Sequence, residues 1–320
     1  MKSRALGTSG LVGSAIGLGC LGMSGLYGRS DDSESLRTIS RAAELGVSFL
    51  DTSDVYGDGA NEVLVGKAVR ADRDRYQVIT KFGVIPAKDG VPARYDGSPA
   101  YIRQACDASL RRMGLETIDL YLQHRVDPKV PIEESIGTLA ELVAEGKVRY
   151  IGMSDATPDA LRRAHAVHPV SVLQSEYSLA ERGVEEEVLG VCAELGVGFM
   201  AFSPLSRGLL TGQLDTAALD DTDIRKTSYF PRVGPELLQA NASKLDPLRE
   251  IASEKESTPA QVALAWLLAQ RPWVVPIPGA RTVQEVESNA QAADIELTMA
   301  DLERLDGVSK AILGARVNRR

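Results

Sequence analysis

Residues 118–154 read IDLYLQHRVDPKVPIEESIGTLAELVAEGKVRYIGMS and contain a complete strand, helix and second strand. The apolar run 118–124 is typical of a buried strand. An amphipathic helix follows, with core positions three or four residues apart at Ile132, Ile136, Leu139 and Val143. Gly146 is suited to end that helix, and the next apolar run begins at Val148.

The same rhythm of apolar run, loop and helix repeats along the chain. Eight runs are candidate strands: 15–20, 47–51, 77–81, 118–124, 148–154, 170–174, 197–203 and 274–278. Near-continuous apolar strands separated by helices predict a parallel sheet with a helical cover. An open doubly wound sheet is the alternative. The strand count and the lack of a Gly-x-Gly-x-x-Gly turn after an early strand favour a closed barrel. We therefore predict an α/β protein with one (β/α)8 TIM-barrel domain over residues 1–320.

Three segments depart from the repeat. Residues 4–14 are rich in glycine and predict an N-terminal hairpin that plugs the barrel floor. Residues 299–313 predict an extra C-terminal helix outside the barrel. Residues 203–235 are too long for an ordinary loop, so we expect a functional lid, with a poorly ordered loop as the alternative.

Composition excludes several classes of protein. The 320 residues carry a formal net charge of -8, whereas binding to phosphate backbones needs a clustered basic face; we read Arg316, Arg319 and Arg320 as a solvated tail. The three cysteines lack disulfide or CxxC spacing, which favours a reducing compartment. No signal-peptide run is visible at the start, and the apolar run 262–269 is too short to span a bilayer. We therefore expect a cytoplasmic protein that binds neither nucleic acid nor membrane, and the oligomeric state stays open.

Polar side chains follow three successive candidate strands. The second leads into DTSDVYG (51–57), the third ends in Thr80-Lys81, and the fourth ends in Gln123-His124-Arg125. In such a barrel the working residues lie where strands enter their following loops, and neighbouring strands lie about 4.8 Å apart. We therefore expect Asp51, Tyr56, Lys81 and His124 to converge on one cavity.

These four side chains suit proton transfer to a carbonyl oxygen. A tyrosine hydroxyl normally has a pKa near about 10, so a neighbouring cation such as Lys81 is needed to stabilise its phenolate. Asp51 would keep Lys81 charged, and a neutral His124 would hold the carbonyl while Tyr56 gives the proton. Each side chain alone also fits a turn, surface or core role. The spacing by itself leaves these two interpretations about even.

Six segments carry a resemblance to a known family. They are GLGCLGMSGLYG (17–28), DTSDVYG (51–57), TKFG (80–83), IDLYLQH (118–124), GKVRYIGMS (146–154) and IPGAR (277–281). Together and in this order they resemble the aldo-keto reductase superfamily, in the branch near the potassium-channel beta subunits and bacterial and plant reductases of similar length. The resemblance extends from about residue 4 to residue 313.

The resemblance implies a (β/α)8 barrel that reduces aldehydes, with ketones as a second class, and that holds NADPH without a Rossmann domain. Tyr56 would be the acid, assisted by Lys81, Asp51 and His124. The implied cofactor contacts are Gly22, Met23, Asp51, Ser154, Asp155, Gln174, Phe202, Ser203, Leu205, Arg207, Gly208, Gly279, Ala280, Arg281, Glu285, Ser288 and Asn289. Implied substrate contacts are Tyr27, Phe82, His124 and Arg125. A helix N-terminus after IPG, with Arg281 beside it, suits a 2′-phosphate, which favours NADPH over NADH.

The sequence departs from this family at three positions. Asp155 replaces a frequent asparagine, Ser288 a frequent glutamate, and Ala180 a frequent tryptophan. Two other functions are weaker hypotheses: a redox-sensing regulatory subunit that acts through a partner, and a barrel aldolase with Lys81 as a Schiff-base nucleophile. A metal site is not expected, because no His, Cys or Asp cluster has ligand spacing. The carbonyl substrate is not specified by the sequence.

Overall fold

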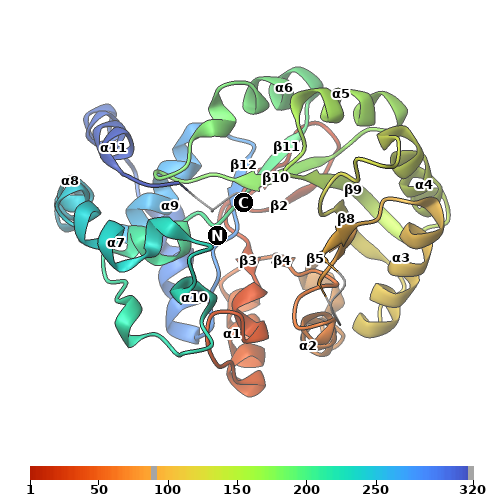
Figure 1. Ribbon diagram of the computed structural model, residues 1–320, viewed down its shortest axis with the longest axis horizontal. Helices are drawn as coiled ribbons and strands as arrows, with labels where there is room; N and C mark the ends of the chain where they lie inside the picture. Colours follow the sequence, from red (N-terminus) through yellow and green to blue (C-terminus); the bar gives the residue numbers. More distant parts are fainter. Residues whose placement is uncertain (88–91, 316–320) are drawn as a thin grey trace.

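A computed structural model describes residues 1–87 and 92–315, and it shows a ring of parallel strands surrounded by helices (Figure 1). In ring order the eight strands are β3 (Leu18–Gly19), β4 (Phe49–Asp51), β5 (Gln77–Phe82), β8 (Ile118–Gln123), β9 (Val148–Ser154), β10 (Val172–Glu176), β11 (Gly198–Phe202) and β12 (Val274–Pro276). Each strand falls on one of the eight predicted runs. The predicted (β/α)8 barrel is therefore confirmed. The tail at Arg316, Arg319 and Arg320 lies outside the described residues.

The ring closes where β12 meets β3. The N–H groups of Gly17 and Gly19 donate to the carbonyls of Pro276 and Pro278, both at 2.9 Å. Because proline has no N–H, these two residues only accept hydrogen bonds, and both strands are shorter than predicted. A Cβ added at Gly19 would lie 2.9 Å from the carbonyl oxygen of Ile277. Glycine therefore allows the two strands to come close enough to close the barrel.

Helices follow the strands and cover the ring. They are α1 (Asp32–Glu44), α2 (Ala60–Val69), α3 (Pro99–Met113), α4 (Ile132–Ala144), α5 (Pro158–Val167), α6 (Val188–Leu195), α9 (Pro259–Gln270) and α10 (Val283–Gln291). Each helix from α1 to α6 packs beside the next, α9 packs beside α10, and α10 packs against α1. The main apolar core lies between this layer and the strands.

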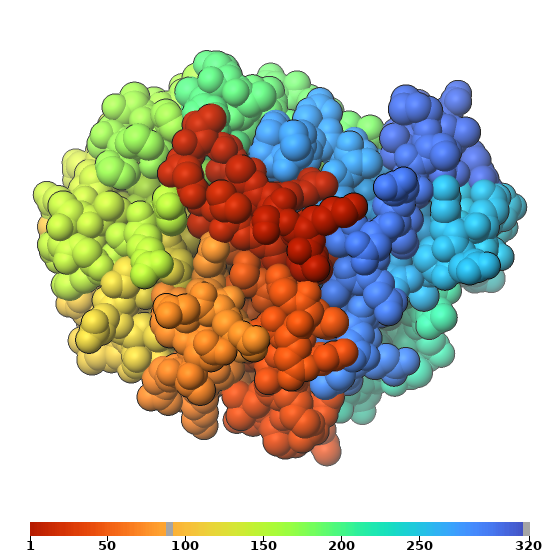
Figure 2. All heavy atoms as spheres, turned by 180° about the vertical axis from the view of Figure 1, so that it is seen from behind, coloured from red at the N-terminus to blue at the C-terminus, as the bar shows by residue number. Residues whose placement is uncertain are grey.

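The N-terminal hairpin closes one end of the barrel, as predicted. β1 (Ser3–Ala5) pairs antiparallel with β2 (Val12–Ser14), and Figure 2 shows this segment lying across the centre of that face. Leu6 and Leu11 join a separate apolar cluster with interior side chains such as Leu122 and Met200. Burying a leucine stabilises a fold by about 1.5–3 kcal/mol. The hairpin therefore seals the floor, and the opposite end is left for the site.

Four further segments lie outside the ring. The predicted C-terminal helix is α11 (Met299–Ala311), which packs on α8 (Asp246–Glu254). A small hairpin between β5 and α3, formed by β6 (Val84–Ile85) and β7 (Arg94–Tyr95), was not predicted because its strands are too short for a periodic pattern. The segment 203–235 forms short 3-10 turns at Ser206–Thr211, Thr216–Ala218, Ile224–Lys226 and Pro231–Val233, and leads into α7 (Pro235–Asn241). Among the described residues, no helix has the length and apolar character to cross a membrane.

Candidate active site

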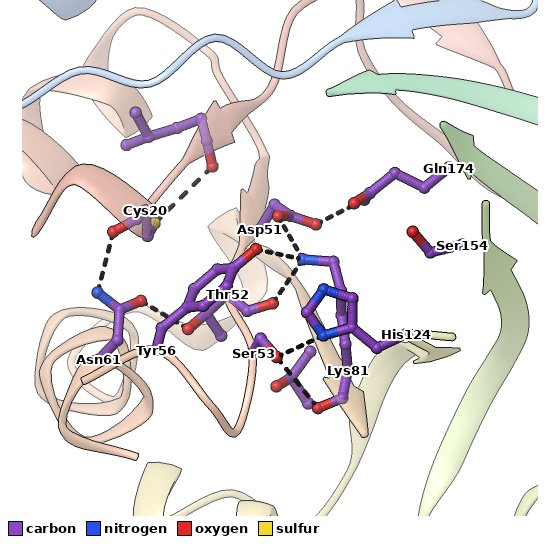
Figure 3. A network of polar contacts seen from close by, with 12 residues as sticks. Cys20, Asp51, Thr52, Ser53, Tyr56, Asn61, Lys81, His124, Ser154 and Gln174 are labelled. Atoms are coloured by element: carbon purple, nitrogen blue, oxygen red, sulfur yellow. Dashed lines mark hydrogen bonds and ion pairs between the residues drawn. The ribbon is translucent and has the colours of Figure 1, made fainter. Parts of the chain in front are cut away.

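A buried lysine occupies the mouth of the barrel. Lys81, near the end of β5, is 1% exposed, and Asp51, at the end of β4, is 3% exposed. The Lys81 ammonium donates to the Asp51 carboxylate at 2.6 Å, to the Thr52 carbonyl at 2.8 Å and to the Tyr56 hydroxyl at 3.3 Å. Each of its three N–H bonds therefore has an acceptor, and the cation is held beneath Tyr56 (Figure 3).

The ionic state of Lys81 follows from its neighbours. Burial alone would lower its pKa, but Asp51 and Tyr56 outweigh burial, and the pKa is raised above its usual value. Lys81 is therefore protonated at neutral pH. A Schiff-base nucleophile must be a free amine, so this geometry argues against the aldolase hypothesis.

Tyr56 lies in the loop after β4 with its hydroxyl at the Lys81 ammonium. Burial raises the pKa of Tyr56, and Lys81 opposes that effect without cancelling it. We expected Lys81 to bring this pKa toward neutrality, and in the structure burial prevails. The hydroxyl therefore keeps its proton at neutral pH and can serve as a donor, while Lys81 is placed to stabilise the phenolate that donation leaves behind.

His124 follows β8 and faces Tyr56 across the mouth, with the two ring centroids 6.2 Å apart and nearly perpendicular. Its pKa is lowered well below the usual value, first by burial and then by the charges of Lys81 and Arg125. The imidazole is therefore neutral. Its Nδ1 lies 3.2 Å from the Ser53 hydroxyl, which leaves Nε2 directed toward Tyr56 and Lys81 (Figure 3).

Gln174 on β10 completes this cluster from the far side. Its side-chain amide donates to the second Asp51 oxygen at 2.7 Å, so Asp51 is held from both Lys81 and Gln174. The structure thus brings together the four predicted catalytic side chains and one predicted cofactor contact. This arrangement can hold a carbonyl oxygen near a neutral imidazole and protonate it from a tyrosine.

Residues with strained backbone conformations cluster in the loops after β9 and β11, at the rim of the barrel mouth. Among the described residues, only six other than glycine have positive φ. Three of them, Ser203, Ser206 and Arg207, lie just after β11, and Asp155 lies just after β9. Such conformations cost about 1–3 kcal/mol each and gather at ligand-binding sites. The rim after β9 and β11 is therefore a candidate binding surface.

The loop after β11 contains a buried cation. The Arg207 guanidinium donates to both oxygens of Glu176 at 2.8 and 2.9 Å and lies over the Phe230 ring. Its Nε is buried and has no hydrogen-bond partner among the described residues. Gly208 beside it has φ 103°. A buried, incompletely bonded guanidinium next to a glycine turn suits a phosphate group.

The remaining predicted cofactor positions lie along the rim from β11 to α1. Phe202 ends β11 and is half-buried against the interior apolar cluster, whereas Leu205 packs on the main core. Gly279 bridges to Gly19, and Asn289 on α10 donates to the Gly279 carbonyl at 3.2 Å. Ala280 and Met23 are buried, and Ser288 is half-buried with its carbonyl bonded to Gln261.

Arg281 lies where this rim reaches the loop after β3. Its guanidinium donates to the Tyr27 carbonyl at 2.7 Å, and its backbone N–H donates to Glu285 at 2.6 Å. A Cβ added at Gly22 would lie 3.2 Å from the Arg281 side chain, so these two positions adjoin each other. Arg281 is half-buried, and its side chain is held between Gly22 and the Tyr27 carbonyl.

The predicted substrate positions divide into two groups. Tyr27 lies beneath the Arg225 guanidinium, and Arg125 holds Ser154 at 3.2 Å and Asp155 at 3.2 Å. Phe82 does not reach the mouth: it is fully buried and packs on Tyr121 in the core beneath the helices. Side chains alternate along a strand, so Phe82 points outward because its neighbour Lys81 points inward.

The structure adds polar residues that sequence reasoning did not single out. Asn61 accepts from Thr52 at 2.6 Å and donates to the Cys20 carbonyl at 2.9 Å, which fixes the loop that carries Tyr56. Glu176 lies two residues after Gln174, so the period-two pattern of a strand would have placed it at the same mouth. Ser53 was visible only as a member of the DTSDVYG stretch. No group of three metal-ligating side chains occurs in the part of the chain that the structure describes.

Comparison with known proteins gives consistent matches. The sequence model of the Aldo/keto reductase family matches residues 15–310. "Probable aldo-keto reductase 1" from Glycine max is 43% identical over 303 residues, which cover 94% of this chain and 86% of that protein.

Solved structures of similar fold belong to the same group. The glycerol dehydrogenase AKR11B4 from Gluconobacter oxydans has a TM-score of 0.84 and 28% identity, covering 99% of this chain and 97% of that one. An aldo/keto reductase from Klebsiella pneumoniae, in complex with NADP and acetate, has a TM-score of 0.76 and 26% identity, covering 99% of both chains.

Proposed function

We propose, on the premise that this chain belongs to the aldo/keto reductase family, that it is an NADPH-dependent oxidoreductase that reduces aldehydes to alcohols, with ketones as a second substrate class. The observation that carries this proposal is the contact of the buried Lys81 ammonium with both Asp51 and Tyr56. A protonated tyrosine backed by a fixed cation is the donor that a carbonyl oxygen needs as its carbon is reduced.

The proposed mechanism assigns one role to each side chain. The neutral His124 donates a hydrogen bond to the carbonyl oxygen and positions it. Tyr56 gives its proton to that oxygen as negative charge develops there. Lys81, held by Asp51, stabilises the resulting phenolate, because its positive charge is already in place when the phenolate forms.

The residues of the rim fit a dinucleotide phosphate. NADPH would supply the hydride when bound. Arg207 and Gly208 would hold its pyrophosphate, with Arg207 released from Glu176, and Ser154 and Gln174 would lie at the nicotinamide amide. We propose as cofactor contacts all the residues that the family resemblance implied. For the substrate we propose Tyr27, His124 and Arg125, without Phe82.

Three other sequence predictions stay as proposals. We propose one barrel domain over residues 1–320, a cytoplasmic location and a small-molecule carbonyl as the partner, with neither nucleic acid nor membrane bound. The described structure supports the location only through Cys20, Cys106 and Cys192, which are buried and free of disulfides.

We also propose that residues 203–235 act as a lid. Ile224 donates to the Leu26 carbonyl at 3.1 Å, which joins this segment to the loop after β3.

The proposed function is tested by a direct assay. Purified protein should oxidise NADPH, followed by the loss of its absorbance, when aromatic and aliphatic aldehydes are added. The alcohol should appear in equal amount by chromatography. Tight NADPH binding without turnover of any carbonyl would overturn the reductase assignment and favour the regulatory-subunit hypothesis.

Arg281→Ala should separate the two nicotinamide cofactors. A hydrogen bond from a charged group contributes about 1.5–3 kcal/mol, so we expect the Kd for NADPH to rise about 10- to 100-fold and the Kd for NADH to change less than about threefold. Titration calorimetry with both cofactors measures this difference. Arg29→Ala, on the exposed loop nearby, is the matched control. Equal weakening of both cofactors by Arg281→Ala would mean that the 2′-phosphate is recognised elsewhere.

A further inference from the structure

Two residues of the DTSDVYG stretch that the mechanism does not use lie directly behind His124. The Ser53 hydroxyl is 3.2 Å from His124 Nδ1 (Figure 3). It is also 3.2 Å from an oxygen of the Asp54 carboxyl. Ser53 is fully buried and Asp54 is half-buried. We propose that Asp54 is a positioning residue that acts through Ser53 to set which nitrogen of His124 carries the proton.

The Ser53 hydroxyl has a single proton to donate. Ser53 can donate to Asp54 at 3.2 Å, to His124 at 3.2 Å or to the Lys81 carbonyl at 3.5 Å, which is the longest of the three contacts, but to only one of them at a time. If Asp54 is ionised, it can only accept, so Ser53 donates to Asp54 and His124 Nδ1 must donate to Ser53. If Asp54 is protonated, it can donate to Ser53, and Ser53 then donates to Nδ1. The same heavy-atom positions therefore allow two opposite tautomers of a neutral imidazole.

Only one of these tautomers suits the proposed function, on which this inference rests for its catalytic consequence. A proton on Nε2 lets His124 donate to a carbonyl oxygen. A proton on Nδ1 leaves a lone pair on Nε2, which repels that oxygen. Asp54 would thus switch His124 between a donor and an acceptor without any movement of the chain.

The surroundings of Asp54 favour its neutral form near physiological pH. Burial first, and then the negative charge of Glu62 on α2, raise the pKa of Asp54 to about 7. Glu62 is itself fully buried and bonded to Thr80 on β5 and Arg112 on α3. Arg112 and the Ser53 hydrogen bond oppose the rise. Tyr101 on α3 and Tyr121 on β8 are the other titratable groups that interact with Asp54, and burial raises the pKa of both.

The tautomer can be observed without any reaction. The chain has three histidines, so ¹⁵N-histidine labelling gives three pairs of ring-nitrogen signals, with His165 and His168 as internal references and His124 assigned from His124→Gln. In the native protein, the bare nitrogen of His124 should change from Nδ1 to Nε2 between pH 6 and pH 8. In Asp54→Asn, whose amide can donate to Ser53 at every pH, it should stay at Nδ1. In Ser53→Ala the pH dependence should disappear.

A matched control and an activity measurement complete the test. Asp58→Asn removes a carboxylate from the same loop at an exposed residue with φ 54°, a conformation that asparagine tolerates, and should leave the tautomer change intact. If Asp54 has a pKa of about 7, the neutral fraction falls about tenfold from pH 6 to pH 8, and kcat/KM for an aldehyde should fall equally. Asp54→Asn should flatten that profile to within about twofold.

The outcomes are distinguishable. A native tautomer that stays constant from pH 6 to pH 8, or a change that persists in Asp54→Asn, would overturn the role of Asp54. If no carbonyl is reduced by any variant, the proposed function fails, and the spectroscopic result still decides the tautomer on its own.

Discussion

Tyr56→Phe should lower kcat/KM for aldehyde reduction by roughly 10²–10⁴-fold, the usual contribution of a positioned general acid. The substitution removes only the hydroxyl, which accepts from Lys81 at 3.3 Å and holds the proton that the carbonyl oxygen needs. The aromatic ring remains, so the packing against His124 is kept. Initial rates of NADPH oxidation over a range of aldehyde concentrations, with NADPH saturating, measure the loss.

Cofactor binding separates a chemical defect from a structural one. We expect the Kd for NADPH, measured by fluorescence quenching, to change less than about threefold in Tyr56→Phe. Tyr76→Phe, which removes a hydroxyl from a buried tyrosine just before β5, should behave like the native protein in both measurements. If Tyr56→Phe retained native kcat/KM, the proton donor would be another group and our assignment would be wrong.

The barrel was predictable because its strands are apolar on both faces. The runs at 118–124 and 148–154 match β8 and β9 closely, since a strand buried on both sides leaves a continuous signal. The first and last strands were predicted too long. Their ends depend on hydrogen bonds across the seam, from Gly17 to Pro276 and from Gly19 to Pro278. This contact joins segments far apart in the sequence, so no local pattern contains it.

The residue types of the site could be predicted from the sequence, but the direction in which its pKa values shift could not. Strand-end placement brought Asp51, Lys81 and His124 to one mouth because parallel strands share their carboxyl edge. The pKa of Tyr56 was expected to fall and instead rises, because burial outweighs Lys81. Burial of a side chain depends on the whole fold. Whether burial or a neighbouring charge decides the direction of a pKa shift therefore cannot be predicted from the neighbours in sequence.

Side-chain direction explains the remaining difference. Phe82 was expected at the substrate, and it packs on Tyr121 instead. The alternation of a strand allows only one of two adjacent residues to face the barrel axis. Once Lys81 is assigned to the interior, Phe82 must be outside, so a stricter use of the period would have excluded it.

Lys81→Met should abolish most activity and also destabilise the protein. Methionine fills a similar volume, but Asp51 is left buried without its cation, and Gln174 is the side-chain donor that remains among the described residues. Breaking a buried ion pair by removing one partner costs about 3–5 kcal/mol, and we expect the free energy of unfolding in urea to fall by about that amount. The activity should fall at least about 100-fold, because Tyr56 loses the cation that stabilises its phenolate.

The pH dependence of this stability loss follows from Lys81. Its pKa is raised in the folded protein, so its stabilising effect is fully present below the unfolded value of about 10.4 and is lost only as pH rises through the higher folded value. The difference in unfolding free energy between native protein and Lys81→Met should therefore be constant from pH 6 to pH 9. A difference that vanished within this range would mean that Lys81 is not the charged partner of Asp51.

The double variant Asp51→Asn/Lys81→Met distinguishes the stabilising role of the pair from its catalytic role. Asparagine is neutral and can still accept from Gln174, so no buried charge is left without a partner, and the free energy of unfolding should return to within about 1–2 kcal/mol of the native value. Activity should stay as low as in Lys81→Met, because the cation beneath Tyr56 is still missing. Recovery of activity together with stability would show that Lys81 serves only to keep the barrel mouth folded. Continued inactivity in a stable protein would assign to Lys81 the role of stabilising the phenolate.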